Sequence, residues 1–245
     1  MESLREKVDS YEAPEDAKKI VEKMRIALIV GIAAAGKDSI IREILKDTEN
    51  FSRIITTIPR APRPGEIQDV SYHFIDNEKV RENLENKKYF EAKLVHGRVY
   101  GTTTDELSRI TEEKKIALGD VDVQGVEEYH RVARNLVSIF IIPPSFEIWQ
   151  KRWSGRDDSK SSEEKRNRMI SAEAELDFAL RSNYYRFVIN DDLKEAAEIS
   201  RKLIADKKFA KKYSDDEAKK AAKKLHDDIE RELGGETHQF VLRLE

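Results

Sequence analysis

The chain has 245 residues, of which 39% are hydrophobic and 38% are charged, and this length fits one domain with extensions or two small domains. The absence of cysteine excludes disulfides, thiolate metal sites and cysteine nucleophiles. Lys and Arg total 45 against 48 Asp and Glu, a net charge of -3, so no overall attraction to nucleic acid or acidic membranes is expected.

Residues 1–24 are predicted to form a polar helical extension. Pro14 suits the first position of a short helix. The first residues lack the apolar core of a secretion signal, and no run approaches the roughly 18 apolar residues that a membrane span needs. We therefore expect a cytoplasmic protein without a membrane partner.

Four apolar runs with helical patterns between them follow this extension. Strand–helix alternation is typical of an α/β fold in which helices cover a parallel sheet, and this is the fold class that we expect. The predicted strands are residues 26–30, 115–121, 136–142 and 186–190.

A glycine loop that carries a lysine follows the first of these strands. Gly31, four free residues, Gly36 and Lys37 match a phosphate-binding loop, and the apolar residues that follow recur at helical spacing. Strand, loop and helix in this order point backbone N–H groups at an anion, and Lys37 would reach the β- and γ-phosphates. The glycines alone would also suit a plain turn, but Lys37 and the flanking pattern favour phosphate binding.

One position departs from the phosphate-loop pattern. Asp38 stands where a Ser or Thr hydroxyl normally binds Mg²⁺, and Ser39 follows it. A carboxylate here either repels the triphosphate or binds Mg²⁺ directly, since Mg²⁺ prefers hard oxygen ligands. Asp120, at the end of a predicted strand, is the natural second ligand.

A second anion site is predicted between residues 56 and 74. Arg60 and Arg63 lie three residues apart on a backbone stiffened by prolines, so they can grip phosphate oxygens with little entropy to lose. The Tyr72 hydroxyl completes an anion pocket.

The order and spacing of these motifs resemble the guanylate kinases. The likeness covers residues 25 to about 205 and leaves both ends outside. Besides the glycine loop, the matching segments are Arg60-Ala61-Pro62-Arg63-Pro64-Gly65-Glu66, Tyr72-His73-Phe74, Glu91, Tyr100-Gly101-Thr102, Asp120-Val121-Asp122-Val123-Gln124-Gly125 and Asn190-Asp191-Asp192.

The resemblance implies a small GMP-binding subdomain at about 55–105. The residues that would hold the GMP phosphate are Arg60, Arg63, Tyr72 and Tyr100. Glu91, with Asp122 beside it, would accept hydrogen bonds from N1–H and the exocyclic amine of guanine. The hydroxyls of Thr56 and Thr102 would donate to O6. Adenine presents the opposite pattern at this edge and would leave Glu91 unpaired.

The resemblance also implies ATP:GMP phosphotransfer on a P-loop NTPase core, with Mg²⁺ and a helical lid at about 152–170. Positive groups on the lid would close over the transferred phosphoryl group, because this reaction depends on positioning and charge neutralisation. The lid arginines would be Arg152, Arg156 and Arg168. The residues around ATP would be Gly31, Ala33, Ala34, Ala35, Gly36, Lys37, Asp38, Ser39 and Asn190. Trp149 and Trp153 are interpreted as packing residues, and His73 and His96 as bystanders, because the reaction needs no general base.

Two further positions depart from the family pattern: Ala34 replaces a loop glycine and Ser71 replaces an Asp. If Ala34 needs a positive φ, the turn is strained. An active kinase for GMP or dGMP is the favoured function. The alternative is a catalytically impaired module that binds GMP or a phosphorylated or acidic protein segment. A kinase for a phosphorylated molecule without a base would leave Glu91 and Asp122 unused.

Residues 209–245 are predicted as a Lys-rich helical extension outside the domain of residues 25–208. Ser214 to Glu217 form a capping-box pattern that begins a helix ending near Gly234. Asp and Glu alternate with the lysines, so a solvated face is favoured over a contact surface. Residues 240–244 are a candidate strand, and a monomer or homodimer without a nucleic-acid partner is expected.

Overall fold

The structure, a computed structural model, describes residues 4–63, 65–95, 97–154 and 162–234. Its contacts divide the chain into two compact units. The first unit contains Met1–Ala27, Asp47–Gly119 and Gln124–Leu136. The second contains Leu28–Lys46, Asp120–Val123 and Val137–Glu245.

A five-stranded sheet is built from the apolar runs of the sequence. Its strands are β1 (Arg25–Val30), β2 (Phe51–Arg53), β7 (Ile116–Asp120), β8 (Asn135–Ile142) and β9 (Tyr185–Ile189). Their order is β2-β7-β1-β8-β9, and the pairs β2–β7 and β8–β9 run parallel. The four strands predicted from sequence are confirmed to within one residue at each end. The parallel-sheet α/β fold is therefore confirmed.

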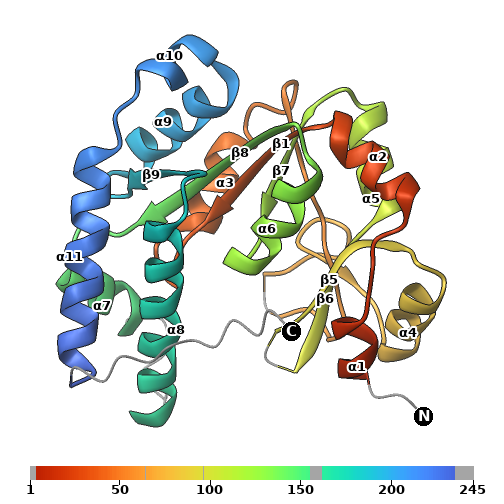
Figure 1. The fold of residues 1–245 in the computed structure, drawn as a ribbon, viewed down its shortest axis with the longest axis horizontal. Coiled ribbons are helices and arrows are strands. Elements are labelled where there is room, and N and C mark those ends of the chain that lie inside the picture. The colour runs from red at the N-terminus through yellow and green to blue at the C-terminus, as the bar shows by residue number, and fades with distance from the viewer. Residues whose placement is uncertain (1–3, 64, 96, 155–161, 235–245) are drawn as a thin grey trace. The chain divides into compact units, whose positions relative to one another are not determined.

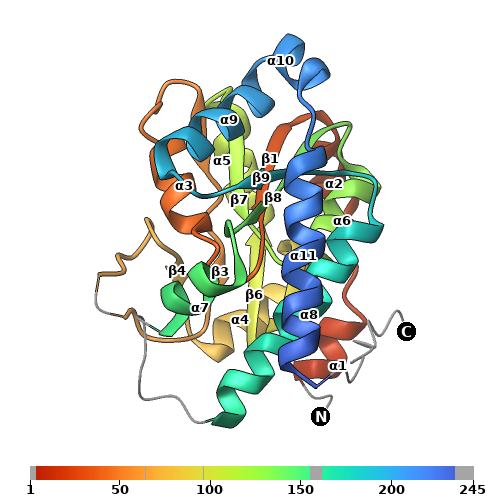
Figure 2. The ribbon, with the colours of Figure 1, turned by 90° about the vertical axis from the view of Figure 1, so that its left-hand side faces the viewer.

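The first unit also holds a four-stranded sheet, of which β5 and β6 are labelled in Figure 1 and β3 and β4 in Figure 2. Its strands are β3 (Thr57–Ile58), β4 (His73–Phe74), β5 (Tyr89–Val95) and β6 (Arg98–Thr103), in the order β4-β3-β6-β5. The helices of this part of the chain are α1 (Leu4–Asp9), α2 (Glu15–Lys23), α4 (Asn77–Glu85), α5 (Thr104–Glu112) and α6 (Val123–Val132). Glu91 pairs opposite Thr102, and Thr57 pairs opposite His73. One small sheet therefore carries several of the predicted acceptor residues.

The N-terminal extension covers the outer edge of this small sheet. Its helix α2 is the one predicted after Pro14, and α1 packs against β5 and α4, where Val8 joins an apolar cluster. Between the two helices, the Tyr11 hydroxyl donates to Tyr89 O at 2.7 Å and accepts from Tyr89 N–H at 2.9 Å. Burial raises the pKa of Tyr11 to about 12. Because β5 is the last strand of its sheet, Tyr11 satisfies backbone groups that would otherwise form an open edge.

The second unit contains six helices among its described residues. They are α3 (Lys37–Ile44), α7 (Phe146–Ser154), α8 (Ser162–Arg181), α9 (Leu193–Ala205), α10 (Lys207–Lys212) and α11 (Asp216–Glu232). α3 packs against α9, and α11 runs beside α8 (Figures 1 and 2). The face of α11 that is buried carries Ala218, Ala222, Leu225 and Ile229, one apolar stripe at helical spacing. Across the described residues, no helix combines the length and the apolar character of a membrane span.

The start of α11 differs from the prediction. The helix begins at Asp216, so Asp215 occupies the N-cap position in place of Ser214, and its side chain makes no capping bond. Asp215 Oδ2 instead accepts from Phe187 N–H at 3.1 Å, and the Tyr213 hydroxyl donates to Phe187 O at 3.0 Å. β9 is the last strand of its sheet, so both contacts satisfy its open edge. The end of the helix near Gly234 agrees with the sequence, whereas the candidate strand at 240–244 lies outside the described residues.

Replacing Asp215 with alanine is expected to lower the free energy of unfolding by roughly 1–3 kcal/mol, because the buried Phe187 N–H then loses its acceptor. Thermal unfolding followed by circular dichroism measures the change. Asp216→Ala is the matched control: Asp216 is exposed and accepts from the neighbouring Ser214 hydroxyl, so its loss should cost at most about 0.5 kcal/mol. Equal losses in the two variants would contradict this account of the β9 edge.

Candidate active site

The glycine loop joins β1 to α3 in the second unit. Three of its carbonyls accept hydrogen bonds from side chains: Ala33 O from Trp149 Nε1 at 2.8 Å, Ala35 O from Asn190 Nδ2 at 2.7 Å, and Gly31 O from Lys37 Nζ at 2.5 Å. The C=O and N–H of a peptide unit point in opposite directions, so these contacts fix the orientation of three N–H groups of the loop. Backbone N–H groups of a glycine loop can form an anion-binding concavity.

Carboxylates gather near the loop lysine. Burial raises the pKa of Glu175, on α8, to about 7; the Lys37 charge opposes this shift, and the charges of Asp122 and Asp120 add to it. Asp38 is exposed in the first turn of α3. A cation would relieve the repulsion among these carboxylates, and hard oxygen atoms are what Mg²⁺ prefers. The oxygen chemistry of these carboxylates suits Mg²⁺, although no three of them bring ligand atoms within 4.8 Å of one another in the described part of the chain.

Arg60, in the first unit, is held by an acidic neighbour that the sequence analysis left without a role. Its Nη1 and Nη2 donate to the two carboxylate oxygens of Glu66 at 2.5 and 2.7 Å, and this contact lowers the pKa of Glu66 to about 2. Nη1 also donates to Ala61 O. Arg60 Nε is buried and has no hydrogen-bond partner among the described residues. The N–H groups on the Nε–Nη2 edge of the guanidinium can therefore donate together to an oxyanion.

Aromatic rings surround this guanidinium. Arg60 lies over the rings of Tyr72 and Phe74, 5.4 and 5.3 Å from their centroids. The Tyr72 ring meets the Tyr100 ring edge-on at 6.2 Å. Arg63 donates its backbone N–H to Glu66 at 2.7 Å, and its side chain is exposed. The structure thus brings together Arg60, Tyr72 and Tyr100, and it places Arg63 in the same turn.

The residues predicted to recognise the base differ in burial and in the unit to which they belong. Glu91 is 7% exposed and accepts from the hydroxyl of the fully buried Thr102 at 2.8 Å. Thr102 therefore orients Glu91 in this arrangement, and its predicted contact with O6 stays a prediction. Thr56 is half-buried, and its carbonyl accepts from His73 N–H. Asp122 belongs to the second unit and is exposed.

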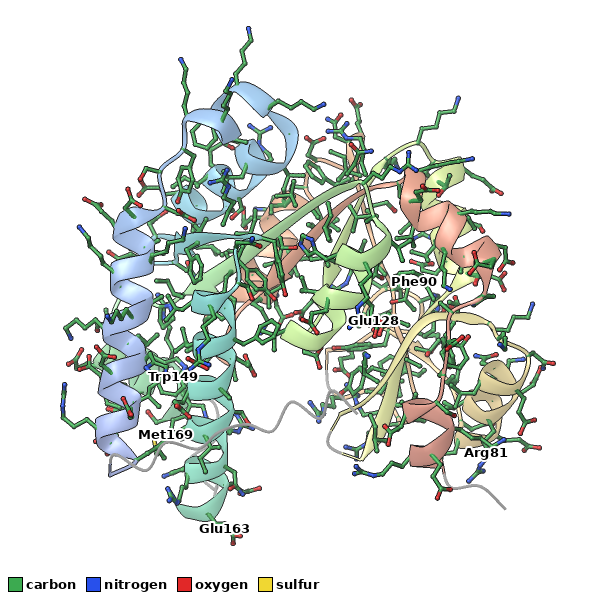
Figure 3. All side chains as sticks on the ribbon, in the orientation of Figure 1. Arg81, Phe90, Glu128, Trp149, Glu163 and Met169 are labelled. Atoms are coloured by element: carbon green, nitrogen blue, oxygen red, sulfur yellow. The ribbon has the colours of Figure 1, made fainter. Side chains whose placement is uncertain are left out.

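The predicted lid and adenine residues lie in the second unit. Arg152 is half-buried, and its Nη1 has no hydrogen-bond partner within the described part of the chain. Arg168 is half-buried on α8, and Arg156 lies outside the described residues. Asn190 is buried and braces the glycine loop, so its contact with adenine stays a prediction. Trp149, labelled in Figure 3, is 1% exposed and stacks on Trp153, in agreement with a packing role.

Comparisons with known proteins decide the family. A family model described as guanylate kinase matches residues 23–207. This chain belongs to the guanylate kinase family. Guanylate kinase 1 of Oryza sativa subsp. japonica is 33% identical over 188 residues, which cover 76% of this chain and 49% of the relative, so the chain spans about half of that protein. The guanylate kinase of Sulfurimonas denitrificans is 32% identical over 183 residues, which cover 74% of this chain and 86% of the relative.

A solved guanylate kinase supports the same fold. The crystal structure of guanylate kinase from Anaplasma phagocytophilum aligns with a TM-score of 0.57 and 24% sequence identity over 74% of this chain and 84% of that chain. As a member of the guanylate kinase family, the chain is an enzyme of the nucleoside monophosphate kinase class. The family match ends at residue 207, before α11 begins.

One loop position is strained where the guanylate kinases usually have glycine. Ala34 adopts a φ of 66°, and the left-handed region costs a residue with a Cβ roughly 1–2 kcal/mol. The strain foreseen for this substitution is therefore present. Gly36 has a φ of 98°, which favours glycine, and a Cβ there would also lie 2.1 Å from Asn190 Nδ2, the group that braces the loop.

Ala34→Gly is expected to raise the free energy of unfolding by about 0.5–1 kcal/mol, because glycine relieves the strain of the left-handed backbone. The greater conformational entropy that glycine gives the unfolded chain offsets part of this stabilisation. Thermal unfolding measures the change. Ala35→Gly is the matched control: Ala35 is buried and outside the left-handed region, so it should lose about 1 kcal/mol. A loss of stability in both variants would contradict the strain at Ala34.

Three carboxylates to which the sequence assigned no role contact or face predicted site residues, two of them in the first unit and one in the second. Glu66 holds Arg60, Glu175 faces the charges around Lys37, and Glu106 accepts from Ile55 N–H beside Thr56. Glu66 stands inside the guanylate kinase segment quoted above, so the motif itself held the signal. Glu106 and Glu175 lie on helices where nothing in the local pattern separates them from surface carboxylates.

Proposed function

We propose that this protein transfers the γ-phosphoryl group of ATP to GMP or dGMP, releasing ADP and GDP or dGDP, with Mg²⁺ as its metal cofactor. Membership of the guanylate kinase family supports the reaction class. The observation that carries the choice of guanine is the buried carboxylate of Glu91, oriented by the Thr102 hydroxyl.

Glu91 suits guanine because N1–H and the exocyclic amine are neighbouring donors, and a carboxylate can accept both. The hydroxyl of Thr102 occupies only part of the accepting capacity of one oxygen, since each carboxylate oxygen offers about two lone-pair sites. Adenine would leave this buried carboxylate without donors, which can lower reactivity by about 10⁴–10⁵. Thr56 and Asp122 are assigned to the same base by resemblance.

The GMP phosphate is proposed to bind the Nε–Nη2 edge of Arg60. Glu66 already fixes the guanidinium, so little side-chain entropy remains to be lost on binding. Tyr72 and Tyr100 contribute their hydroxyls, and Arg63 contributes a second positive charge from the same turn.

On the donor side, the ATP phosphates are assigned to the loop of residues 31–36 and to the start of α3, with Lys37 at the β- and γ-phosphates. Asp38 and Asp120 would hold Mg²⁺, which neutralises phosphate charge when bound. The half-buried Arg152 and Arg168 have the charge needed to close over the transferred group and exclude water. Arg156 is proposed to join them.

Acceptor selectivity tests this proposal. ATP and Mg²⁺ are incubated with GMP, dGMP, AMP, CMP or UMP, and the diphosphate products are separated by anion-exchange chromatography. GDP and dGDP are expected, with the other acceptors slower by at least about 10³-fold because they leave Glu91 unpaired. Comparable rates with AMP and GMP would overturn the guanine assignment.

A further inference from the structure

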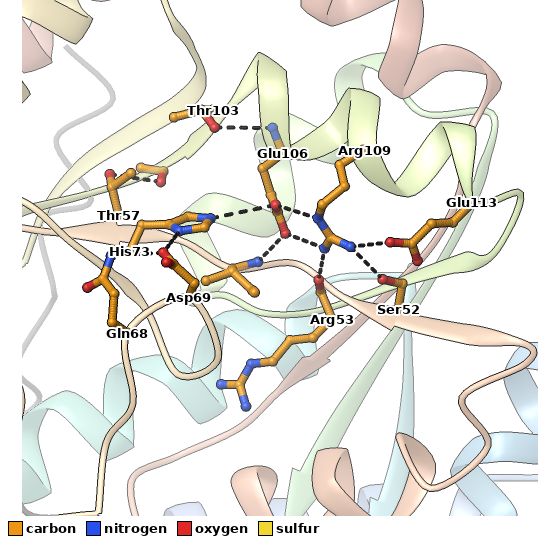
Figure 4. Close-up of polar contacts among 12 residues, drawn as sticks. Ser52, Arg53, Thr57, Gln68, Asp69, His73, Thr103, Glu106, Arg109 and Glu113 are labelled. Atoms are coloured by element: carbon orange, nitrogen blue, oxygen red, sulfur yellow. Dashed lines mark hydrogen bonds and ion pairs between the residues drawn. The ribbon is translucent and has the colours of Figure 1, made fainter.

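His73 lies within a polar network of the first unit (Figure 4). Its Nδ1 is 2.7 Å from Asp69 Oδ1, and its Nε2 is 3.6 Å from Glu106 Oε2. A neutral imidazole carries one N–H and can donate to only one of these carboxylates. The imidazolium can donate to Asp69 and at the same time place a charged N–H toward Glu106, so the geometry suits the protonated ring.

Glu106 is held in its ionised form on the far side of this contact. It is 4% exposed and accepts from Ile55 N–H at 2.8 Å and from Arg109 Nε and Nη2 at 2.9 and 2.7 Å. Burial alone would raise the pKa of Glu106, but Arg109, the nearby His73 ring and the Ile55 N–H keep it below its ordinary value. Glu106 therefore presents a fixed negative charge to His73.

Two carboxylates face His73 among the described residues, Asp69 on its own loop and Glu106 on α5. Arg109 stands behind Glu106 and also pairs with Glu113. Glu106 raises the pKa of His73 most, burial opposes it, and Asp69 adds to the rise. A raised folded-state pKa means that the bridge is complete below about 6.5 and is lost as pH rises through the higher folded value.

Two residues of this network, His73 and Ile55, are each next in sequence to a proposed GMP contact. His73 directly follows Tyr72, and the Glu106 carboxylate holds the N–H of Ile55, which directly precedes Thr56. The bridge from His73 to Glu106 therefore fixes the phosphate-binding segment relative to the segment that leads into the base site.

On the basis of the GMP site proposed above, we propose that protonated His73 is a positioning residue for GMP, which fastens Tyr72 and the adjoining strand β4 to α5. His73 acts through Tyr72 and Arg60 and does not contact the reacting atoms. GMP binding and protonation of His73 are then linked, so bound GMP must raise the pKa of His73 as much as protonation tightens GMP binding. This assigns a function to a residue that the sequence analysis treated as a bystander.

An NMR titration of the histidine imidazoles, with and without saturating GMP, tests this linkage, and the spectrum of His73→Asn identifies the His73 signal. The pKa of His73 is expected to lie above about 6.5 and to rise by about 0.5–1 with GMP, equivalent to roughly 3- to 10-fold tighter binding by the protonated form. An unchanged pKa at saturating GMP would overturn the inference.

Calorimetric titration of GMP gives the second readout. At pH 6.5, His73→Asn is expected to raise the Kd for GMP about 3- to 10-fold, and the two proteins should converge at pH 9, where the wild-type bridge is also lost. The GMP phosphate titrates in the same way in both proteins, so the ratio of Kd values isolates His73. His226→Gln, on α11, is the matched histidine control and should leave the ratio near one. If the His73→Asn variant does not fold, the same measurements are made with His73→Gln.

The outcomes separate the two proposals. If GDP forms but GMP leaves the pKa of His73 unchanged, the positioning role fails and the kinase stands. If GMP raises the pKa but no GDP forms, the kinase fails and the positioning role stands. If GMP does not bind, both fail.

Discussion

Replacing Lys37 with alanine is expected to lower kcat for GMP phosphorylation by about 10³-fold or more, because even one uncharged donor at a developing charge is worth about 10²–10³. Lys37 Nζ already donates to Gly31 O, so the end of its side chain is held at the loop without ATP. The acceptor residues Arg60 and Glu91 belong to the other unit, so the Kd for GMP should stay within about twofold. A coupled assay of ADP release measures kcat, and calorimetry measures the Kd.

Lys46→Ala is the matched control for this variant. Lys46 follows α3, is largely exposed and pairs with Glu43, so its loss should leave kcat within about twofold. Full activity in Lys37→Ala would remove the glycine loop from the reaction. Loss of GMP binding in Lys37→Ala would contradict the assignment of the loop to ATP.

Glu91→Gln is expected to lower kcat/KM for GMP by about 10²–10⁴, because the new amide cannot accept from both neighbouring guanine donors and leaves buried polar groups unpaired. The Thr102 hydroxyl can still donate to the amide oxygen, so the fold and the side-chain position should be kept. KM for ATP should change by less than about twofold, since Glu91 faces the acceptor base only. Steady-state kinetics with each substrate varied in turn separate these effects.

Glu128→Gln provides the matched carboxylate control. Glu128, labelled in Figure 3, lies on α6 of the same unit and pairs with Lys93 of β5 at 2.9 Å. A partly exposed ion pair contributes little, so kcat/KM for GMP should stay within about twofold. Equal changes in the GMP and ATP constants of Glu91→Gln would refute the guanine assignment.

The main strands could be predicted because buried parallel strands are continuous apolar runs in the sequence. β1 is an example: every residue after Arg25 in it is buried. β2, β3 and β4 have two or three residues each, and such short strands carry no periodicity. The glycine loop and the acceptor segments were predictable because their chemistry depends on residue type and order.

Side-chain partners could not be predicted in the same way, because they join segments far apart in the sequence. Asp215 follows a capping-box serine but accepts from Phe187, 28 positions away. Thr102 has the hydroxyl that the sequence assigns to guanine O6, and in the structure this hydroxyl donates a hydrogen bond to Glu91 on the neighbouring strand. In the sequence, Glu106 cannot be distinguished from other carboxylates in the first turn of a helix. Its role depends on the N–H of Ile55, 51 positions away, which donates to it.

In the proposed reaction, the loop with Ala34 and Asp38 still delivers a phosphoryl group to GMP. The most direct test measures ADP release from ATP with GMP and Mg²⁺, and binding of GMP by calorimetry, on the same sample. We predict ADP release that requires both GMP and Mg²⁺ and that stops when EDTA removes the metal. Folded protein that binds GMP and releases no ADP would contradict the claim and would leave a module that binds the acceptor without using it.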